Sequence, residues 1–119
     1  MRDIINFSTE NCPVGYAFRA VEGKWKLPTL WVLCKNGTLR YNELKKALGI
    51  SNMVLTNTLR ELEEFGLVNR VQYNEIPPRV EYSLTEVGTK LMPALHEFGI
   101  WGDLLMQVNK KSNNTLELE

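Results

Sequence analysis

The chain has 119 residues, 44% of them hydrophobic and 24% charged, which is the size and composition of one soluble globular domain. No apolar run approaches the roughly 20 residues that span a bilayer, and the start MRDIINFSTENCP lacks the apolar centre of a secretory signal. We therefore expect a cytoplasmic protein with no membrane partner. The net charge is zero, yet residues 24–79 hold nine basic and five acidic residues, a local charge of +4 that favours contact with nucleic acid.

Two helices are predicted before residue 37. Pro13 suits the first turn of an amphipathic helix that breaks near Gly23. A second helix is predicted over about residues 25–35, with Pro28 in its first turn and Asn36-Gly37 at its end. The apolar residues that recur along the first helix are Val14, Phe18 and Val21, and the apolar stripe of the second is Leu27, Leu30, Trp31 and Cys34.

A short extended piece at residues 38–41 separates these helices from two more. Asn42 can cap a third helix that ends at Leu48 and is closed by Gly49. Ser51 can cap a fourth helix that ends before Gly66. Because the turn between the third and fourth helices is short and contains glycine, the pair is typical of a helix-turn-helix. The inner stripe of the fourth helix is Leu55, Leu59 and Leu62.

Two strands, residues 67–73 and 79–84, should form a hairpin in which Val80, Tyr82 and Leu84 point inward. Thr85 can then cap a last helical region that Pro93 and Gly99 should kink or divide. The predicted fold is mainly α with a small β-hairpin, an α+β winged helix-turn-helix with N- and C-terminal dimerisation helices. We expect a single domain over residues 1–111, with a winged-helix core at 14–84, C-terminal helices at 85–111, and a disordered tail or vector remnant at 112–119.

Successive residues of an α-helix are turned by about 100°, so the leucine stripe of the fourth helix determines which residues lie on its opposite face. That opposite face is polar. Asparagine can pair with adenine, arginine with guanine, and threonine or methionine can touch a thymine methyl. We therefore expect this helix to read double-stranded operator DNA; the alternative is an ordinary solvated face. The predicted contacts are Ser51, Asn52, Met53, Thr56, Asn57 and Arg60.

Further basic residues could hold the DNA backbone. Arg79 follows the turn of the hairpin, at the tip of the wing, where it could reach a phosphate or the minor groove. Arg70 and Gln72 are expected to lie on the same side of the hairpin. Each of these could instead be a solvated surface charge. The other candidate phosphate contacts are Lys24 and Lys26 at the start of the second helix, and Arg40, Lys45 and Lys46 around the third.

Three segments closely resemble the HxlR-type winged-helix regulators of bacteria: GKWKLPTLWVL, LRYNELKKALGISNMVLTNTLRELEEFGLVNR and PPRVEYSLTEVGTKLMPAL, closing on Trp101-Gly102. The resemblance covers about residues 12–102. It departs from the family at Glu22, where a second glycine usually precedes GKW, and this affects a turn more than a contact surface. The resemblance implies a dimeric repressor or activator that responds to chemical stress or metabolites.

The two cysteines have different interpretations. Cys12 lies at a helix N-terminus, where the dipole favours a thiolate, and the resemblance implies that a cysteine before this proline can sense oxidants or electrophiles. The alternative for Cys12 is a half-buried structural residue, and Cys34 is expected to pack in the core. With two distant cysteines and the single His96, we expect no metal site and no cofactor. No catalytic motif is present, so an enzyme is not expected.

The C-terminal helical region is longer than a winged helix needs to close its core. Its Phe98, Trp101, Leu105 and Val108 have no obvious partner within one copy, and an exposed apolar stripe usually marks an interface. We expect a homodimer in which they meet the first helix, through Val14, Tyr16 and Phe18, across a two-fold axis. The alternatives are a monomer closed by this helix and, for function, a protein–protein interaction module without specific DNA binding.

Overall fold

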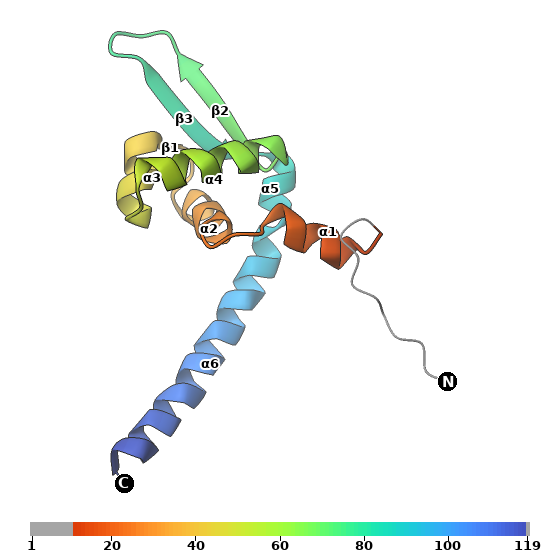
Figure 1. Cartoon of the computed structure of the whole chain (residues 1–119), viewed down its shortest axis with the longest axis vertical. Helices are drawn as coiled ribbons and strands as arrows, with labels where there is room; N and C mark the ends of the chain where they lie inside the picture. The colour runs from red at the N-terminus through yellow and green to blue at the C-terminus, as the bar shows by residue number, and fades with distance from the viewer. Residues whose placement is uncertain (1–10, 119) are drawn as a thin grey trace. The chain divides into compact units, whose positions relative to one another are not determined.

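The computed structural model describes residues 11–118, and the side chains of residues 11–111. It forms two compact units, one through Thr89 and one from Lys90 onward. Among the described residues, no helix is long and apolar enough to cross a membrane. The elements are α1 (Pro13–Ala20), α2 (Lys26–Asn36), β1 (Leu39–Arg40), α3 (Tyr41–Leu48), α4 (Asn52–Glu64), β2 (Val68–Tyr73), β3 (Arg79–Leu84), α5 (Glu86–Lys90) and α6 (Met92–Leu118) (Figure 1).

The turn between α3 and α4 is built as the sequence predicts. Gly49 ends α3 with φ 65°, a left-handed conformation that suits glycine because it has no Cβ. The Ser51 hydroxyl oxygen accepts a hydrogen bond from the Val54 N–H at 3.2 Å and so caps α4. Gly66, with φ 77°, follows the end of α4. The helix-turn-helix therefore has fixed ends on both sides of its turn.

The sheet has three antiparallel strands in the order β1-β3-β2, one more than the predicted hairpin. Strands β2 and β3 pair from Val68 opposite Leu84 to Tyr73 opposite Arg79, and the hairpin projects from the helices around it (Figure 1). Strand β1 adds two residues, with Leu39 opposite Tyr82. A strand of two residues is too short to show a periodic pattern, so the sequence indicates only an extended piece here.

The core of the first unit consists mainly of leucines from the helices, closed by the sheet. The face that α2 buries differs from the predicted one: Lys26 and Thr29 are buried, whereas Leu27, Trp31 and Cys34 are only half-buried. The Thr29 hydroxyl donates to the Trp25 carbonyl at 2.6 Å, which removes the cost of burying it. The buried apolar side chains of this unit are Leu30, Leu33, Leu44, Leu55, Leu59, Leu62, Leu67, Val68 and Tyr82.

Helix α3 begins two residues earlier than predicted. Its N-cap is Arg40, whose backbone N–H donates to the Glu43 carboxylate at 2.9 Å, and Asn42 lies inside the helix. The Glu43 carboxylate thus satisfies the backbone N–H of the cap residue itself, which is one half of a capping box. This shift makes Tyr41 the first residue of α3, and its hydroxyl group reaches α4.

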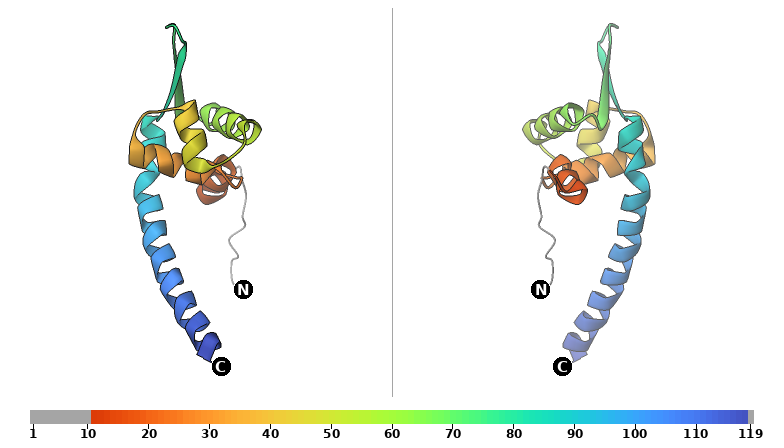
Figure 2. Two further views of the ribbon diagram at one scale, coloured as in Figure 1. Left: turned by 90° about the vertical axis from the view of Figure 1, so that its left-hand side faces the viewer. Right: turned by 90° about the vertical axis from the view of Figure 1, so that its right-hand side faces the viewer.

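The second unit is dominated by α6. The helical region divides at Leu91, so Pro93 occupies the first turn of α6, and Gly99 lies inside it without a break. Figure 2 shows α6 as one continuous helix. The helix runs to Leu118 and so includes most of the segment for which the sequence predicts a disordered tail or vector remnant, residues 112–119. No proline or glycine follows Gly102, and therefore no residue of the tail stops the helix.

Candidate nucleic-acid interface

Helix α4 presents a polar surface opposite its buried stripe. Leu55, Leu59 and Leu62 are buried, whereas Met53 is 75% exposed and its neighbours on that face are exposed as well. Arg60 is also free to reach outward, since its side chain is 60% exposed and its pairing with Glu64, at 3.9 Å, is loose. The residues that share this surface are Ser51, Asn52, Met53, Thr56, Asn57 and Arg60, and we call it the α4 face.

Two side chains of the α4 face are held by a residue of α3. The Tyr41 hydroxyl lies 2.9 Å from Thr56 Oγ1, 3.0 Å from the Asn52 carbonyl oxygen and 3.3 Å from Asn52 Oδ1. Sequence reasoning missed this network because Tyr41 looks like part of an extended piece rather than the start of a helix. It means that Asn52 and Thr56 have a fixed orientation, unlike Asn57, for which no such bond is found within the described residues.

The strand register separates the candidate contacts of the hairpin. Arg70 lies opposite Tyr82 and Gln72 opposite Val80, so both share the face of the sheet that Tyr82 buries. Arg79 lies opposite Tyr73 on the other face, since successive residues of a strand alternate. Arg70 and Gln72 are both exposed. The three side chains therefore do not form one patch.

Arg79 is held by its neighbours rather than extended into solvent. Its side chain is 27% exposed, with Nη2 3.2 Å from Glu75 Oε1 and Nε 4.0 Å from Glu81 Oε1. Its guanidinium carbon lies 4.2 Å from the centre of the Tyr73 ring, a cation–π geometry. Its Nε is buried and has no hydrogen-bond partner within the described residues. The carboxylates of Glu75 and Glu81 already compensate the charge of Arg79. This favours for Arg79 a role in holding the shape of the loop between β2 and β3, residues 74–78, which we call the wing loop.

Lys26 does not lie on the surface as a phosphate contact would. It is 7% exposed, and its Nζ lies 2.9 Å from Glu61 Oε2 on α4 and 5.9 Å from the centre of the Phe65 ring. The hydrogen bond and charge of Lys26 lower the pKa of Glu61 below its ordinary value of 4.5, with a smaller effect from Arg60. We therefore remove Lys26 from the candidate DNA contacts. Its buried ammonium instead joins α2 to α4.

The remaining basic candidates have different surroundings. Lys24 is exposed, with its Nζ 5.2 Å from the centre of the Trp25 ring. Arg40 and Lys46 are exposed, and Lys45 is half-buried. Nothing in the structure assigns any of them to DNA, but Lys24, Arg40 and Lys46 have the exposure that a phosphate contact requires.

Cys12 is the N-cap of α1, at the position where a helix dipole acts on a thiol. It is half-buried, and its carbonyl oxygen accepts a hydrogen bond from the Tyr16 N–H at 2.8 Å. Tyr16 in turn packs edge-on against Phe65, which follows α4 directly, with ring centres 6.4 Å apart. A chain of contacts thus leads from Cys12 to the end of α4. Cys34 is half-buried on α2 rather than fully in the core.

Apolar side chains are exposed on α1 and on α6. On α1 these are Val14, Tyr16 and Phe18. On α6 the rings of Phe98 and Trp101 stack with centres 5.8 Å apart. The helical repeat places all but one of the exposed apolar residues of α6 on one side of that helix, the exception being Met106. The residues on that side are Phe98, Ile100, Trp101, Leu104, Leu105 and Val108.

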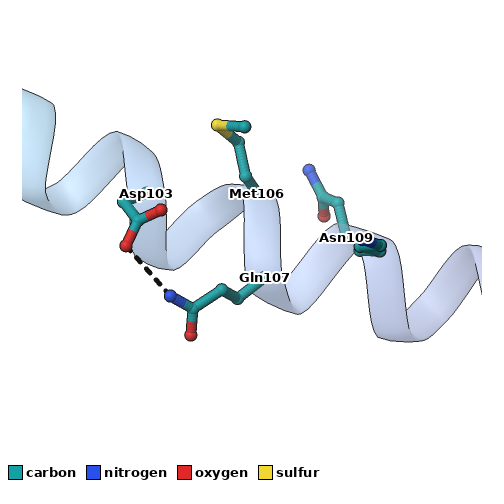
Figure 3. A pocket seen from close by; sticks show the side chains of 5 residues that line it. Asp103, Met106, Gln107 and Asn109 are labelled. Carbon is teal, nitrogen blue, oxygen red and sulfur yellow. Dashed lines mark hydrogen bonds between the residues drawn. The ribbon is translucent and has the colours of Figure 1, made fainter.

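A shallow hollow lies on the more polar side of α6 and is formed by side chains of that helix alone. In Figure 3, Gln107 donates a hydrogen bond to Asp103, with Nε2 and Oδ2 3.0 Å apart, and Met106 and Asn109 lie beside them. The fifth lining residue is Lys110. The hollow brings together no nucleophile and base, and the described residues contain no cluster of His, Cys, Asp or Glu that could hold a metal ion.

Known proteins resemble this chain over most of its length. The model of the HxlR-like helix-turn-helix family matches residues 20–110. A helix-turn-helix transcriptional regulator of Halalkalibacterium halodurans is 40% identical over 94 residues, 78% of this chain and 83% of the relative. The regulator YkvN of Bacillus subtilis is 45% identical over 93 residues, 77% of this chain and 78% of the relative.

Among solved structures, the redox regulator HypR is similar in two forms. The oxidised form has a TM-score of 0.70 and 40% identity, covering 77% of this chain and 95% of HypR. The reduced form has a TM-score of 0.77 and 37% identity, covering 84% of this chain and 99% of HypR. These relatives are transcriptional regulators and not enzymes. The chain is thus a transcriptional regulator of helix-turn-helix type and belongs to the HxlR-like helix-turn-helix family.

Proposed function

We propose that the chain is a sequence-specific DNA-binding regulator that acts as a homodimer on a pseudo-palindromic operator. The observation that carries this is the α4 face: polar and exposed on a helix that is capped at Ser51 and anchored by buried leucines on its other side. A rigid helix with one polar face is what enters the major groove in helix-turn-helix proteins. Asn57 and Arg60 are the side chains of that face best suited to pair with adenine and guanine.

The homodimer is supported by the exposed apolar residues of α1 and α6. Large apolar side chains gathered on one side of a helix are costly to leave in water and usually mark an interface. A two-fold axis would repeat the α4 face, and two such faces would enter successive major grooves about 34 Å apart. The operator should then be a pseudo-palindrome.

The test of DNA binding is fluorescence anisotropy with the promoter region of the chain's own gene and with random DNA, each titrated with salt. Asn57→Ala and Arg60→Ala should each weaken operator binding by ~1–3 kcal/mol while binding to random DNA changes little. Glu63→Ala, at an exposed residue near the C-terminal end of α4 that is not among the predicted contacts, serves as the control. Equal binding of operator and random DNA by the unmodified chain would favour the alternative, a protein–protein interaction module.

We further propose that Cys12 senses an oxidant or electrophile. Its place as N-cap of α1 and the likeness to the redox regulator HypR support this. Treatment with diamide or a quinone should change operator affinity, and Cys12→Ser should keep operator binding but lose the response. Cys34→Ser is the matched control and should respond as the unmodified chain does. An unchanged response in Cys12→Ser would contradict the proposal.

A further inference from the structure

The Tyr41 hydroxyl is placed to control how two residues of the α4 face form hydrogen bonds. It belongs to the first residue of α3, yet it contacts Thr56 Oγ1 at 2.9 Å and two oxygens of Asn52 at 3.0 and 3.3 Å. Both Asn52 and Thr56 are otherwise exposed on the α4 face. One hydroxyl group of α3 therefore touches two of the side chains that the proposed function assigns to base recognition.

The direction of these hydrogen bonds follows from counting protons. A tyrosine hydroxyl has one hydrogen, and the carbonyl and Oδ1 oxygens of Asn52 can only accept. If Tyr41 donated to Thr56, its lone pairs would face both oxygens of Asn52, which is repulsive. The arrangement without such a clash has Thr56 donating to Tyr41, and Tyr41 donating to the two oxygens of Asn52.

This direction decides what each side chain can offer to a base. The single hydroxyl hydrogen of Thr56 points to Tyr41, so Thr56 presents lone pairs and a methyl group outward. Asn52 accepts through Oδ1, so its amide NH₂ group is the part left to act, and it acts as a donor. Without Tyr41, a threonine hydroxyl rotates freely and serves either a donor or an acceptor on a base.

We propose, on the basis of the function proposed above, that Tyr41 is a positioning residue that sets the hydrogen-bonding polarity of the α4 face. Thr56 acts as an acceptor and selects a base that offers an amino group in the major groove, adenine through N6 or cytosine through N4. Asn52 acts as a donor toward a base acceptor or a phosphate oxygen. Guanine and thymine, which offer only acceptors there, are disfavoured at the position that Thr56 reads.

The test is selection of binding sites from random DNA followed by sequencing, with the unmodified chain and three variants. Thr56→Val identifies the base position that Thr56 reads, since only that preference should change. Tyr41→Phe keeps the ring and removes the hydroxyl, and it should reduce the preference for adenine or cytosine at that same position about two- to tenfold, the range expected for one hydrogen bond. Thr89→Val, which removes an exposed hydroxyl group on α5, should leave the profile unchanged.

A double variant separates positioning from stability. If Tyr41 acts through Thr56, then Tyr41→Phe combined with Thr56→Val should change the base preference no more than Thr56→Val alone. A Tyr41→Phe profile identical to that of the unmodified chain would overturn the proposal. So would a uniform loss of affinity with a lower melting temperature, or a preference for guanine or thymine at the Thr56 position. Failure of the unmodified chain to select any sequence would instead overturn the proposed function, and this proposal with it.

Discussion

At the scale of single residues, one ion pair joins two helices that are distant in sequence. Lys26 on α2 is buried against Glu61 on α4, and its ammonium also lies near the ring of Phe65 at the end of α4. A buried ammonium without a partner is costly, so the carboxylate of Glu61 stabilises the fold only while it is charged. The guanidinium carbon of Arg19 on α1 lies 6.0 Å from the centre of the same Phe65 ring. The Lys26–Glu61 pair therefore adds a charged link between α2 and α4 to the packing of the buried leucines.

Glu61→Gln should destabilise the fold at neutral pH, and the destabilisation should fade in acid. The pKa of Glu61 is lowered in the folded chain, so its contribution is fully present above the unfolded value of 4.5 and is lost as the pH falls through the lower folded value. Thermal unfolding of both proteins between pH 7 and pH 3 measures this. Glu63→Gln is the control, since Glu63 is exposed on the same helix. A melting-temperature difference that stays constant over this range would contradict the ion pair.

Arg79 gives a second prediction at this scale. If Arg79 shapes the wing loop through Tyr73, Glu75 and Glu81, then Arg79→Lys should weaken DNA binding nearly as much as Arg79→Ala, because an ammonium cannot replace a planar guanidinium that pairs and stacks. The salt dependence of binding should then keep its slope in both variants. If Arg79→Lys binds normally and Arg79→Ala lowers the slope by about 1, Arg79 is a direct phosphate contact.

At the scale of elements, the end of the sheet is fastened to the end of α4 by one threonine. Thr85 follows β3, and its hydroxyl donates to the Gly66 carbonyl at 2.6 Å and accepts from the Gly88 N–H at 3.0 Å. Its own N–H donates to the Leu67 carbonyl at 3.1 Å. A side chain at Gly88 would meet that same carbonyl group, so glycine is required there for steric reasons. The start of α5 is therefore fixed against the turn after α4.

Thr85→Val should lower the free energy of unfolding by about 1–2 kcal/mol, because it keeps the shape of the side chain and removes both hydroxyl bonds. Urea unfolding measures the change. Thr89→Val removes a single exposed hydroxyl bond, from Thr89 to the Thr85 carbonyl at 3.0 Å, and should cost much less. Equal losses in the two variants would show that the Thr85 hydroxyl does not fasten the sheet to α4.

At the scale of the whole molecule, the proposed homodimer depends on α6. Trp101→Asp places a charge in the middle of the apolar residues on one side of this helix and should release a monomer of 13.7 kDa at micromolar concentration. Sedimentation equilibrium measures the mass. Met106→Asp is the matched control, since Met106 is an exposed apolar residue on the side of α6 away from this set by the helical repeat. An unmodified chain that sediments as a monomer would refute the homodimer.

The local features of this protein were predictable from its sequence. Gly49, Ser51 and Gly66 act on their immediate neighbours, so the turn and the ends of α4 follow from residue type and spacing. The hairpin follows for the same reason, because alternation along a strand is a local pattern. The exposed side of α4 was predictable as well, since the leucine stripe marks the buried side and the opposite side then faces solvent.

Only the tertiary structure decided the features that join distant segments. Burial of Lys26 depends on Glu61, and the orientation of Asn52 and Thr56 depends on Tyr41 of another helix. In each case, the burial or orientation of a polar side chain is determined by a partner that is distant in the sequence and that packing brings close. A pattern of apolar and polar residues carries no information on such pairs, because the free energy of a buried polar group depends on the partner that satisfies it.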